Sequence, residues 1–196
     1  MSLTTLEREA SVIYAKQFYD LDTYVNKTRF YHTWEHISYM LDQLPNCSDE
    51  VYLATVFHDA VYNAQSKTNE EDSALLFEKY ATANPDVFLD VNIGRVSELI
   101  MATKHHGFTD DVEMNRLVKA DLSILYADPA YFARYEHGIY REYGSLPRLI
   151  YVPARSFVLL KLRRKMVASK QFTPTELDRM KKNIGYLVTN LRNESI

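Results

Sequence analysis

Apolar residues recur at spacings of three and four along almost the whole of this 196-residue chain. That period is typical of amphipathic α-helices, and no stretch shows the alternation of a half-buried strand. Glycine (5) and proline (6) are scarce, which disfavours turn-rich β folds and glycine-rich nucleotide loops. The sequence therefore predicts an all-α fold of about eight or nine helices.

Polar breaks, glycines and prolines separate the expected helices. Asn69 is expected to cap the fourth helix, and Glu70, Glu71 and Asp72 follow in its first turn, where acids suit the helix dipole. Pro153 is expected to kink or restart the eighth helix. The ninth begins near Thr173, with Pro174 at the first helical position and Glu176 behind it. The expected helices cover residues 4–19, 31 or 32 to 44, 49–58, 70–83, 91–105, 110–125, 130–143, 148–167 and 174 onwards.

The length favours one domain over residues 1–196, and no linker or repeat interrupts it. Hydrophobic residues make up 46% and charged residues 25%, which are ordinary globular values. A single cysteine, Cys47, excludes an intrachain disulfide and a cysteine-based zinc site, and favours a cytoplasmic location. No apolar run reaches the ~18 residues of a transmembrane helix, and the first residues lack a signal-peptide core.

The net charge of −3 disfavours a general electrostatic grip on nucleic acid or on an anionic membrane. A basic stretch lies near the C-terminus, at Lys161, Arg163, Arg164 and Lys165. We interpret it as a solvated helix face rather than a phosphate or nucleic-acid patch. No nucleic-acid or membrane partner is therefore expected, and a homo-oligomer is left open.

Five of the six histidines lie in three places: His32 with His36, His58, and His105 with His106. Histidine is the commonest metal ligand in proteins. On a helix, His32 and His36 would share one face, with their Cβ atoms ~6 Å apart. The alternative for this pair is two surface or capping histidines.

The dyad His58–Asp59 comes at the expected C-terminal end of a helix, on its apolar side. A carboxylate there opposes the helix dipole and is costly to bury without a partner. A metal cation would remove both objections. The alternative is a His–Asp hydrogen bond at a frayed helix end.

Asp121 is a carboxylate on an otherwise apolar helical stripe with Leu117 and Leu125. Buried acids are rare unless they are paired or bind a metal. The alternative is a buried ion pair, with Arg29, Arg141 or Arg155. Two nitrogens and two carboxylates can thus meet at one centre and leave positions open for water on a divalent ion. The candidate ligands are His36, His58, Asp59 and Asp121.

A second motif competes for the first histidines. His32, Glu35 and His36 match H-x-x-E-H, the inverted zincin pattern, in which both histidines bind zinc and the glutamate is the general base. This pair lies at the start of its expected helix, however, and the zincin interpretation leaves the other three candidate ligands unexplained.

Four segments together resemble the predicted metal-dependent HD superfamily phosphohydrolases: YHTWEH (31–36), FHD (57–59), ATKHH (102–106) and ADL (120–122). The resemblance extends to residues 69–74 and 141–143 and covers about 29–190. It implies a compact HD-domain helical bundle. It also implies an enzyme, a phosphoric ester hydrolase that acts on a nucleotide or other small phosphate ester through a metal-activated water.

YHTWEH also resembles, more distantly, the opening motif of cyclic nucleotide phosphodiesterases, which share the HD fold. That resemblance implies that His32 is the general acid and His36 a metal ligand, with His58, Asp59 and Asp121 completing the set. Thr33 and Tyr62 stand where those enzymes have Asn and His. The resemblance therefore implies phosphorus chemistry without naming the substrate.

The resemblance also implies a cofactor of one or two divalent ions, from among Mn, Mg, Ni, Co, Fe and Zn. His106, or else His105, is the candidate ligand of a second ion, with Asp59 bridging; the alternative is a helix C-cap. Asp59 or Asp121 would orient the water, and Glu70 would be catalytic or orient a ligand. Arg29, Lys104 and Arg141 would hold phosphate charge, unless they are solvated or paired with Glu70 and Glu142.

Three other functions stay open from the sequence. One is a di-iron HD-type oxygenase, which the extra histidines permit. Another is a non-catalytic metal-binding ligand sensor on the same all-α scaffold, in which protein ligands fill every coordination position. The third is a structural helical protein without a metal.

Overall fold

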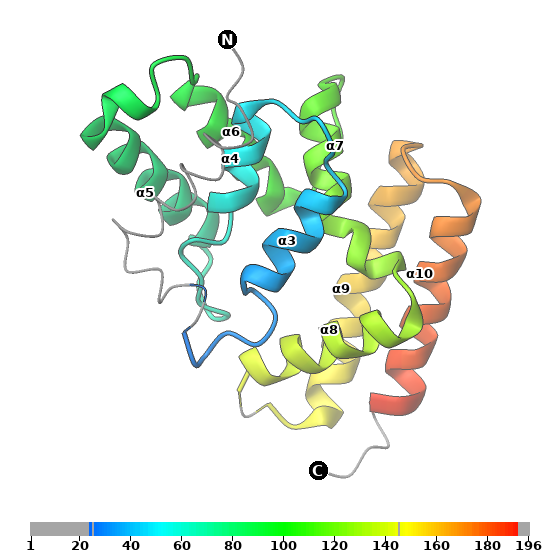
Figure 1. Ribbon diagram of the computed structural model, residues 1–196. Coiled ribbons are helices and arrows are strands. Elements are labelled where there is room, and N and C mark those ends of the chain that lie inside the picture. The colour runs from blue at the N-terminus through cyan, green and yellow to red at the C-terminus, as the bar shows by residue number, and fades with distance from the viewer. Residues whose placement is uncertain (1–23, 25, 145, 192–196) are drawn as a thin grey trace. The chain divides into compact units, whose positions relative to one another are not determined.

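The computed structural model describes residues 24, 26–144 and 146–191 (Figure 1). Over these ranges the chain forms eight α-helices and three short helical turns, and no strand. The all-α prediction is confirmed, while the helix expected over 4–19 lies outside the described residues. None of the described helices is both long enough and apolar enough to cross a membrane.

The chain divides into two compact units, residues 1–120 and 121–196. The division falls within the last turn of α7 (Val112–Asp121), after Ala120. Each unit has its own buried side chains. The single HD-type domain expected from the sequence stays a prediction.

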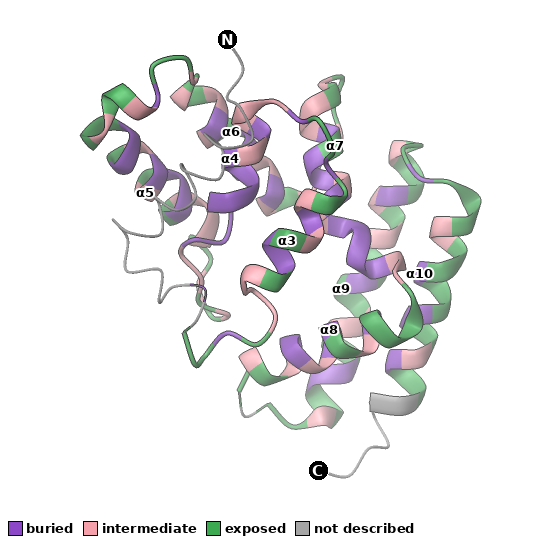
Figure 2. Cartoon of the chain, viewed as in Figure 1, coloured by how far each residue is buried: buried purple, intermediate pink, exposed green. Residues whose placement is uncertain are grey.

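In the first unit, α4 packs against α6 and α6 against α5 (Figure 1). Six of the nine residues of α4 are buried, from Val51 to Phe57, and Figure 2 shows this helix in purple with some pink. Such a helix, apolar all round, has to lie in the core. The described helices of this unit are α3 (Trp34–Asp42), α4 (Asp49–Phe57), α5 (Asn69–Ala83), a 3-10 turn (Pro85–Val87), α6 (Ile93–His105) and α7.

The start of α5 differs from the prediction by one residue, because Thr68 rather than Asn69 is the N-cap. The side chain of Asn69 turns back to the preceding loop. Its Oδ1 accepts from the Asn63 amide and its Nδ2 donates to the Asn63 carbonyl, both at 3.0 Å. The side chain that was expected to cap the helix therefore makes hydrogen bonds to the loop instead. The acids of the first turn, Glu70, Glu71 and Asp72, lie where they were expected.

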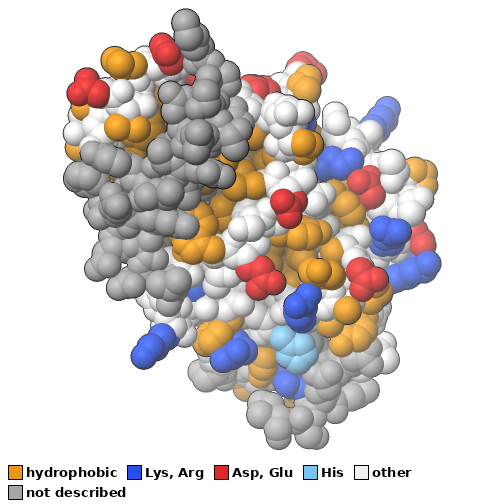
Figure 3. Space-filling view, in the orientation of Figure 1, with side chains coloured by type: hydrophobic (Ala, Val, Ile, Leu, Met, Phe, Trp, Pro, Cys, Tyr) orange, Lys and Arg blue, Asp and Glu red, His pale blue; other side chains and the backbone are white. Residues whose placement is uncertain are grey.

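The second unit contains a 3-10 turn (Leu122–Tyr126), α8 (Pro129–Glu142), α9 (Arg148–Ser169), α10 (Pro174–Tyr186) and a π turn (Leu187–Leu191). α9 and α10 run antiparallel to each other (Figure 1). Thr173 and Glu176 form the expected capping box, with Pro174 in the first turn. The basic stretch of α9 is partly to fully exposed. Figure 3 shows Lys and Arg side chains projecting over α10 as well.

One predicted helix of this region is wrong in part, and for another the structure excludes one of two expected effects of a proline. The helix expected over 110–125 changes to 3-10 geometry after Asp121, so it is not one continuous α-helix. α9 continues through Pro153 as one helix, without a restart. Pro153 lies in the second turn, so the carbonyl that loses its hydrogen-bond donor belongs to Leu149, near the helix start. Leu149 is 71% exposed, and water can hydrate that carbonyl.

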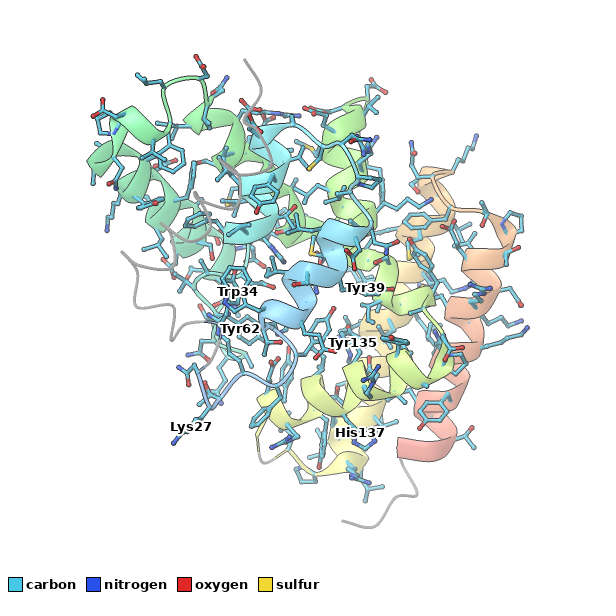
Figure 4. All side chains as sticks on the ribbon, viewed as in Figure 1. Lys27, Trp34, Tyr39, Tyr62, Tyr135 and His137 are labelled. Carbon is cyan, nitrogen blue, oxygen red and sulfur yellow. The ribbon has the colours of Figure 1, made fainter. Side chains whose placement is uncertain are left out.

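A buried ion pair joins α8 to α9 in the second unit. Glu136 is fully buried and accepts from Arg155, with Nη2 3.1 Å from Oε1. The hydroxyl of Tyr151 donates to Oε2 at 3.2 Å, and Arg155 also donates to the hydroxyl of Tyr135, labelled in Figure 4. Burial raises the pKa of Tyr151, and the charge of Glu136 raises it further. All charged and polar members of this cluster are therefore satisfied by one another.

Arg155→Met is expected to lower the free energy of unfolding by about 3–5 kcal/mol, because it leaves the buried carboxylate of Glu136 without its cation. Urea unfolding followed by circular dichroism measures this. Arg134→Met is the control on the exposed side of α8, where Arg134 only covers the Tyr131 ring. We expect that control to change stability by less than about 0.5 kcal/mol. If both variants lost the same free energy of unfolding, the buried ion pair would not stabilise the fold more than the exposed arginine does.

Candidate metal centre

Two buried histidines come from the ends of two helices in the first unit. His36 lies in the first turn of α3 and is 4% exposed. His58 is the C-cap of α4, 3% exposed, and its amide donates to the carbonyl of Ala54 at 2.9 Å. Asp59 follows directly and is 9% exposed. The sequence prediction that this dyad ends a helix on its core side is confirmed.

The ligand atoms of these three residues form a small triangle. Nε2 of His36 lies 3.2 Å from Nε2 of His58 and 3.5 Å from Oδ2 of Asp59. Nε2 of His58 lies 2.9 Å from the same oxygen. With metal–ligand bonds of about 2.1 Å, neighbouring ligands are about 3.0 Å apart in an octahedral site and about 3.4 Å in a tetrahedral site. The triangle therefore has the dimensions of one face of a divalent-ion site.

The hydrogen bond on the other side of the His58 ring determines what faces this triangle. Nδ1 of His58 lies 2.9 Å from the carbonyl of Thr55, which can only accept, so Nδ1 carries the proton. In the neutral ring, Nε2 then presents a lone pair to Oδ2 of Asp59. Two acceptors at 2.9 Å repel each other unless a cation lies between them. An added proton or a metal ion can supply that cation.

The Asp59 carboxyl is charged in this setting. Burial alone would raise its pKa, but the positive charge of His58, and then those of His32 and His36, hold it well below the usual range when these rings are protonated. A buried carboxylate with two imidazole nitrogens around it is a donor set that suits a divalent cation. The residues present therefore fit the metal that the sequence resemblance implies.

Asp121 supplies the fourth predicted ligand. His36, His58 and Asp121 each offer one ligand atom, and these atoms lie within 4.8 Å of one another. Asp121 is the last residue of α7, a helix whose other residues belong to the first unit. It is partly exposed rather than buried, although Leu117 before it and Leu125 after it are both buried. A His/His/Asp group able to hold a metal ion is thus present.

His32 lies close to His36 but precedes α3, the helix that carries His36. The prediction that His32 and His36 share a helix face is wrong, because Thr33 is the N-cap of α3 with an extended backbone. Their ring centroids are nevertheless 6.0 Å apart. His32 is partly exposed and stacks on Tyr62, with centroids 3.9 Å apart and planes at 26°. Figure 4 shows Tyr62 near the first turn of α3, where Trp34 lies.

Lys104 and Glu70, predicted in substrate-binding and catalytic roles, meet between α5 and α6. Nζ of Lys104 pairs with the carboxylate of Glu71 and donates to the carbonyl of Lys67. It lies 3.9 Å from Oε2 of Glu70. The alternative of an ion pair therefore describes Lys104, and the catalytic role of Glu70 stays a prediction.

The remaining predicted residues lie at the end of α6 and on α8. His106 is the C-cap of α6 in the left-handed conformation, with φ of 47°, which matches the capping alternative. His105 is exposed, and neither histidine belongs to the metal-binding group found among the described residues. Arg141 is exposed on α8 in the second unit. A second ion and a phosphate-binding Arg141 stay predictions.

Sequence reasoning missed the residues that orient the ligands. Tyr31 places its hydroxyl 2.9 Å from Nδ1 of His36, and Thr55 accepts from His58. Ser73 fixes the loop after the dyad, because its Oγ accepts from the amide of Val61 at 3.0 Å. Two features of the sequence could have indicated these orienting residues: Tyr31 is next to His32, and Thr55 lies three residues before His58.

Tyr31→Phe is expected to weaken Mn²⁺ binding by about tenfold, because the hydroxyl that holds the His36 ring is removed while the ligand stays. Isothermal titration calorimetry measures the affinity. Tyr140→Phe is the control: its hydroxyl donates to the Leu146 carbonyl in the second unit, so it loses one comparable hydrogen bond. An unchanged Kd in Tyr31→Phe would remove Tyr31 from the support of the site.

No protein-family model, curated protein or solved structure matches this chain.

Proposed function

We propose that this protein is a metal-dependent phosphohydrolase that acts on a nucleotide or another small phosphate ester. The observation that carries the proposal is the ring of His58. Its Nδ1 is committed to a carbonyl, and its Nε2 faces a charged carboxylate and a second imidazole. This arrangement favours a cation at the centre of His36, His58, Asp59 and Asp121. The resemblance of the sequence to HD superfamily phosphohydrolases supports the reaction class.

When bound, a divalent ion supplies Lewis-acid activation of water and of the phosphoryl group. The carboxylates of Asp59 and Asp121 accept hydrogen bonds from water and orient it. His32 lies beside the ligands, is partly exposed, and can protonate the leaving oxygen of an ester within hydrogen-bond reach. In this proposal the ligand histidines stay neutral, while His32 carries the mobile proton.

The test begins with tag-free protein, stripped of metal and incubated with Mn²⁺, Ni²⁺ or Fe²⁺. We expect about one or two equivalents of bound ion by elemental analysis, followed by hydrolysis in a screen of nucleotides and simple phosphate esters. Failure to bind any ion would contradict the proposal and leave a structural helical protein.

Two outcomes would keep the metal but change the function. Bound iron with a mixed-valence EPR signal, and no ester hydrolysis, would indicate the di-iron oxygenase. A bound ion with no position open to water and no activity would indicate the ligand sensor.

A further inference from the structure

Arg29 is a buried cation whose donors point to main-chain carbonyls. It is 7% exposed. Its Nη1 donates to the carbonyl of Asp59 at 2.6 Å and to that of His32 at 3.2 Å. Its Nη2 donates to the carbonyl of Ala60 at 3.0 Å. One guanidinium thus joins the backbone of the His–Asp dyad to the backbone of the proposed proton donor.

Two aromatic rings pack against the guanidinium of Arg29. Cζ of Arg29 lies 5.0 Å from the ring centroid of Tyr24 and 5.5 Å from that of Tyr62. Tyr62 in turn stacks on the imidazole of His32. The hydroxyl of Tyr24 donates to the carbonyl of Val56 at 2.7 Å, which ties this group to the last turn of α4. A planar cation with stacked aromatic rings is therefore fixed in both position and orientation.

The geometry points to Arg29 as a positioning residue: it sets the distance between Asp59 and His32, and Tyr62 sets the plane of the His32 ring. This inference rests on the proposed function for the role of His32 as the acid. The buried guanidinium donates to three main-chain carbonyls, so these donors hold the backbone around the dyad and His32. Lysine cannot replace it, because an ammonium lacks the planar fork and the stacking surface.

The test compares Arg29→Lys with Arg116→Lys. Arg116 also donates to a backbone carbonyl of the first unit, that of Pro45 at 2.9 Å, and is the matched control. In Arg29→Lys we expect Mn²⁺ affinity to fall by about tenfold, as for loss of a residue that supports a metal ligand. The control should keep the wild-type affinity. In hydrolysis assays, kcat should fall in Arg29→Lys with KM within about twofold of wild type.

A second variant, Tyr62→Leu, tests the stack on His32 while the hydrogen bonds of Arg29 to the three carbonyls can remain. We expect wild-type Mn²⁺ affinity, with a downfield shift of the His32 ring protons in NMR spectra of the metal-free protein, assigned from His32→Ala. In Arg29→Lys the same resonances should also move. This readout needs no activity, so it decides the inference even if the wild type hydrolyses nothing or binds no metal.

The inference is overturned if Arg29→Lys keeps both the wild-type Mn²⁺ affinity and the wild-type His32 resonances. A raised KM with unchanged kcat would then assign Arg29 to substrate phosphate, as the sequence resemblance implies. If Arg29→Lys does not fold, Tyr62→Leu decides alone, and unmoved His32 resonances in that variant overturn the inference.

Discussion

Asp59→Ala is expected to lose the bound metal ion and, with it, all hydrolysis. The carboxylate supplies the negative charge that faces Nε2 of both His36 and His58. Without it, the two imidazoles and the carboxylate of Asp121 remain, and the predicted four-ligand set loses one of its two negative charges, which lowers its affinity for a divalent ion. Elemental analysis after dialysis, beside the wild type, measures the loss directly.

Asp86→Ala is the matched control, since Asp86 is an exposed acid in a short turn of the same unit. It should retain the wild-type metal content and activity. If Asp59→Ala kept its metal, the dyad would be a simple His–Asp hydrogen bond, and the metal would have to be bound elsewhere. Thermal unfolding of both variants separates loss of the ligand from loss of the fold.

His32→Ala is expected to keep the metal and lose rate. General acid catalysis contributes typically about 100-fold or more, so kcat should fall by at least about 100-fold on esters with poor leaving groups. The effect should be much smaller on p-nitrophenyl phosphate, because that leaving group needs little protonation. Steady-state kinetics on an alkyl phosphate and on the nitrophenyl ester distinguish the two.

His137→Ala serves as the control, because His137 stands apart from the other histidines in the sequence and lies on α8 of the second unit. Its rates should match those of the wild type. Wild-type hydrolysis of the alkyl ester by His32→Ala would exclude His32 as the acid. Loss of metal from that variant would instead make His32 a ligand.

Much of the ligand set could be predicted from the sequence because it rests on local pattern. The apolar spacing before His58 identified the buried side of α4, and the adjacent acid marked the helix end. Asp121 was found in the same way, as a carboxylate on an apolar stripe. Its partial exposure was not predicted, and the change from α to 3-10 geometry after it leaves no mark in the spacing of apolar residues.

The arrangement around the ligands could not be predicted, because it depends on loops converging in space. Nothing in the residue order indicates that Arg29 meets the carbonyls of both Asp59 and His32. The true start of α3 was missed for a related reason: Thr33 makes no side-chain capping hydrogen bond. The ion pair of Lys104 with Glu71 was also missed, because the two residues are 33 positions apart in the sequence.

The three ligands of the His/His/Asp group come from the first turn of α3, the cap of α4 and the last residue of α7. An ion bound there would link three helix ends that are far apart in the sequence. At a free concentration of 100 times Kd, such a ligand adds about 2.7 kcal/mol to the free energy of unfolding. A chelator should then lower the melting temperature of the wild type but not of Asp59→Ala. The supply of metal in its surroundings would accordingly set what fraction of the molecules is folded.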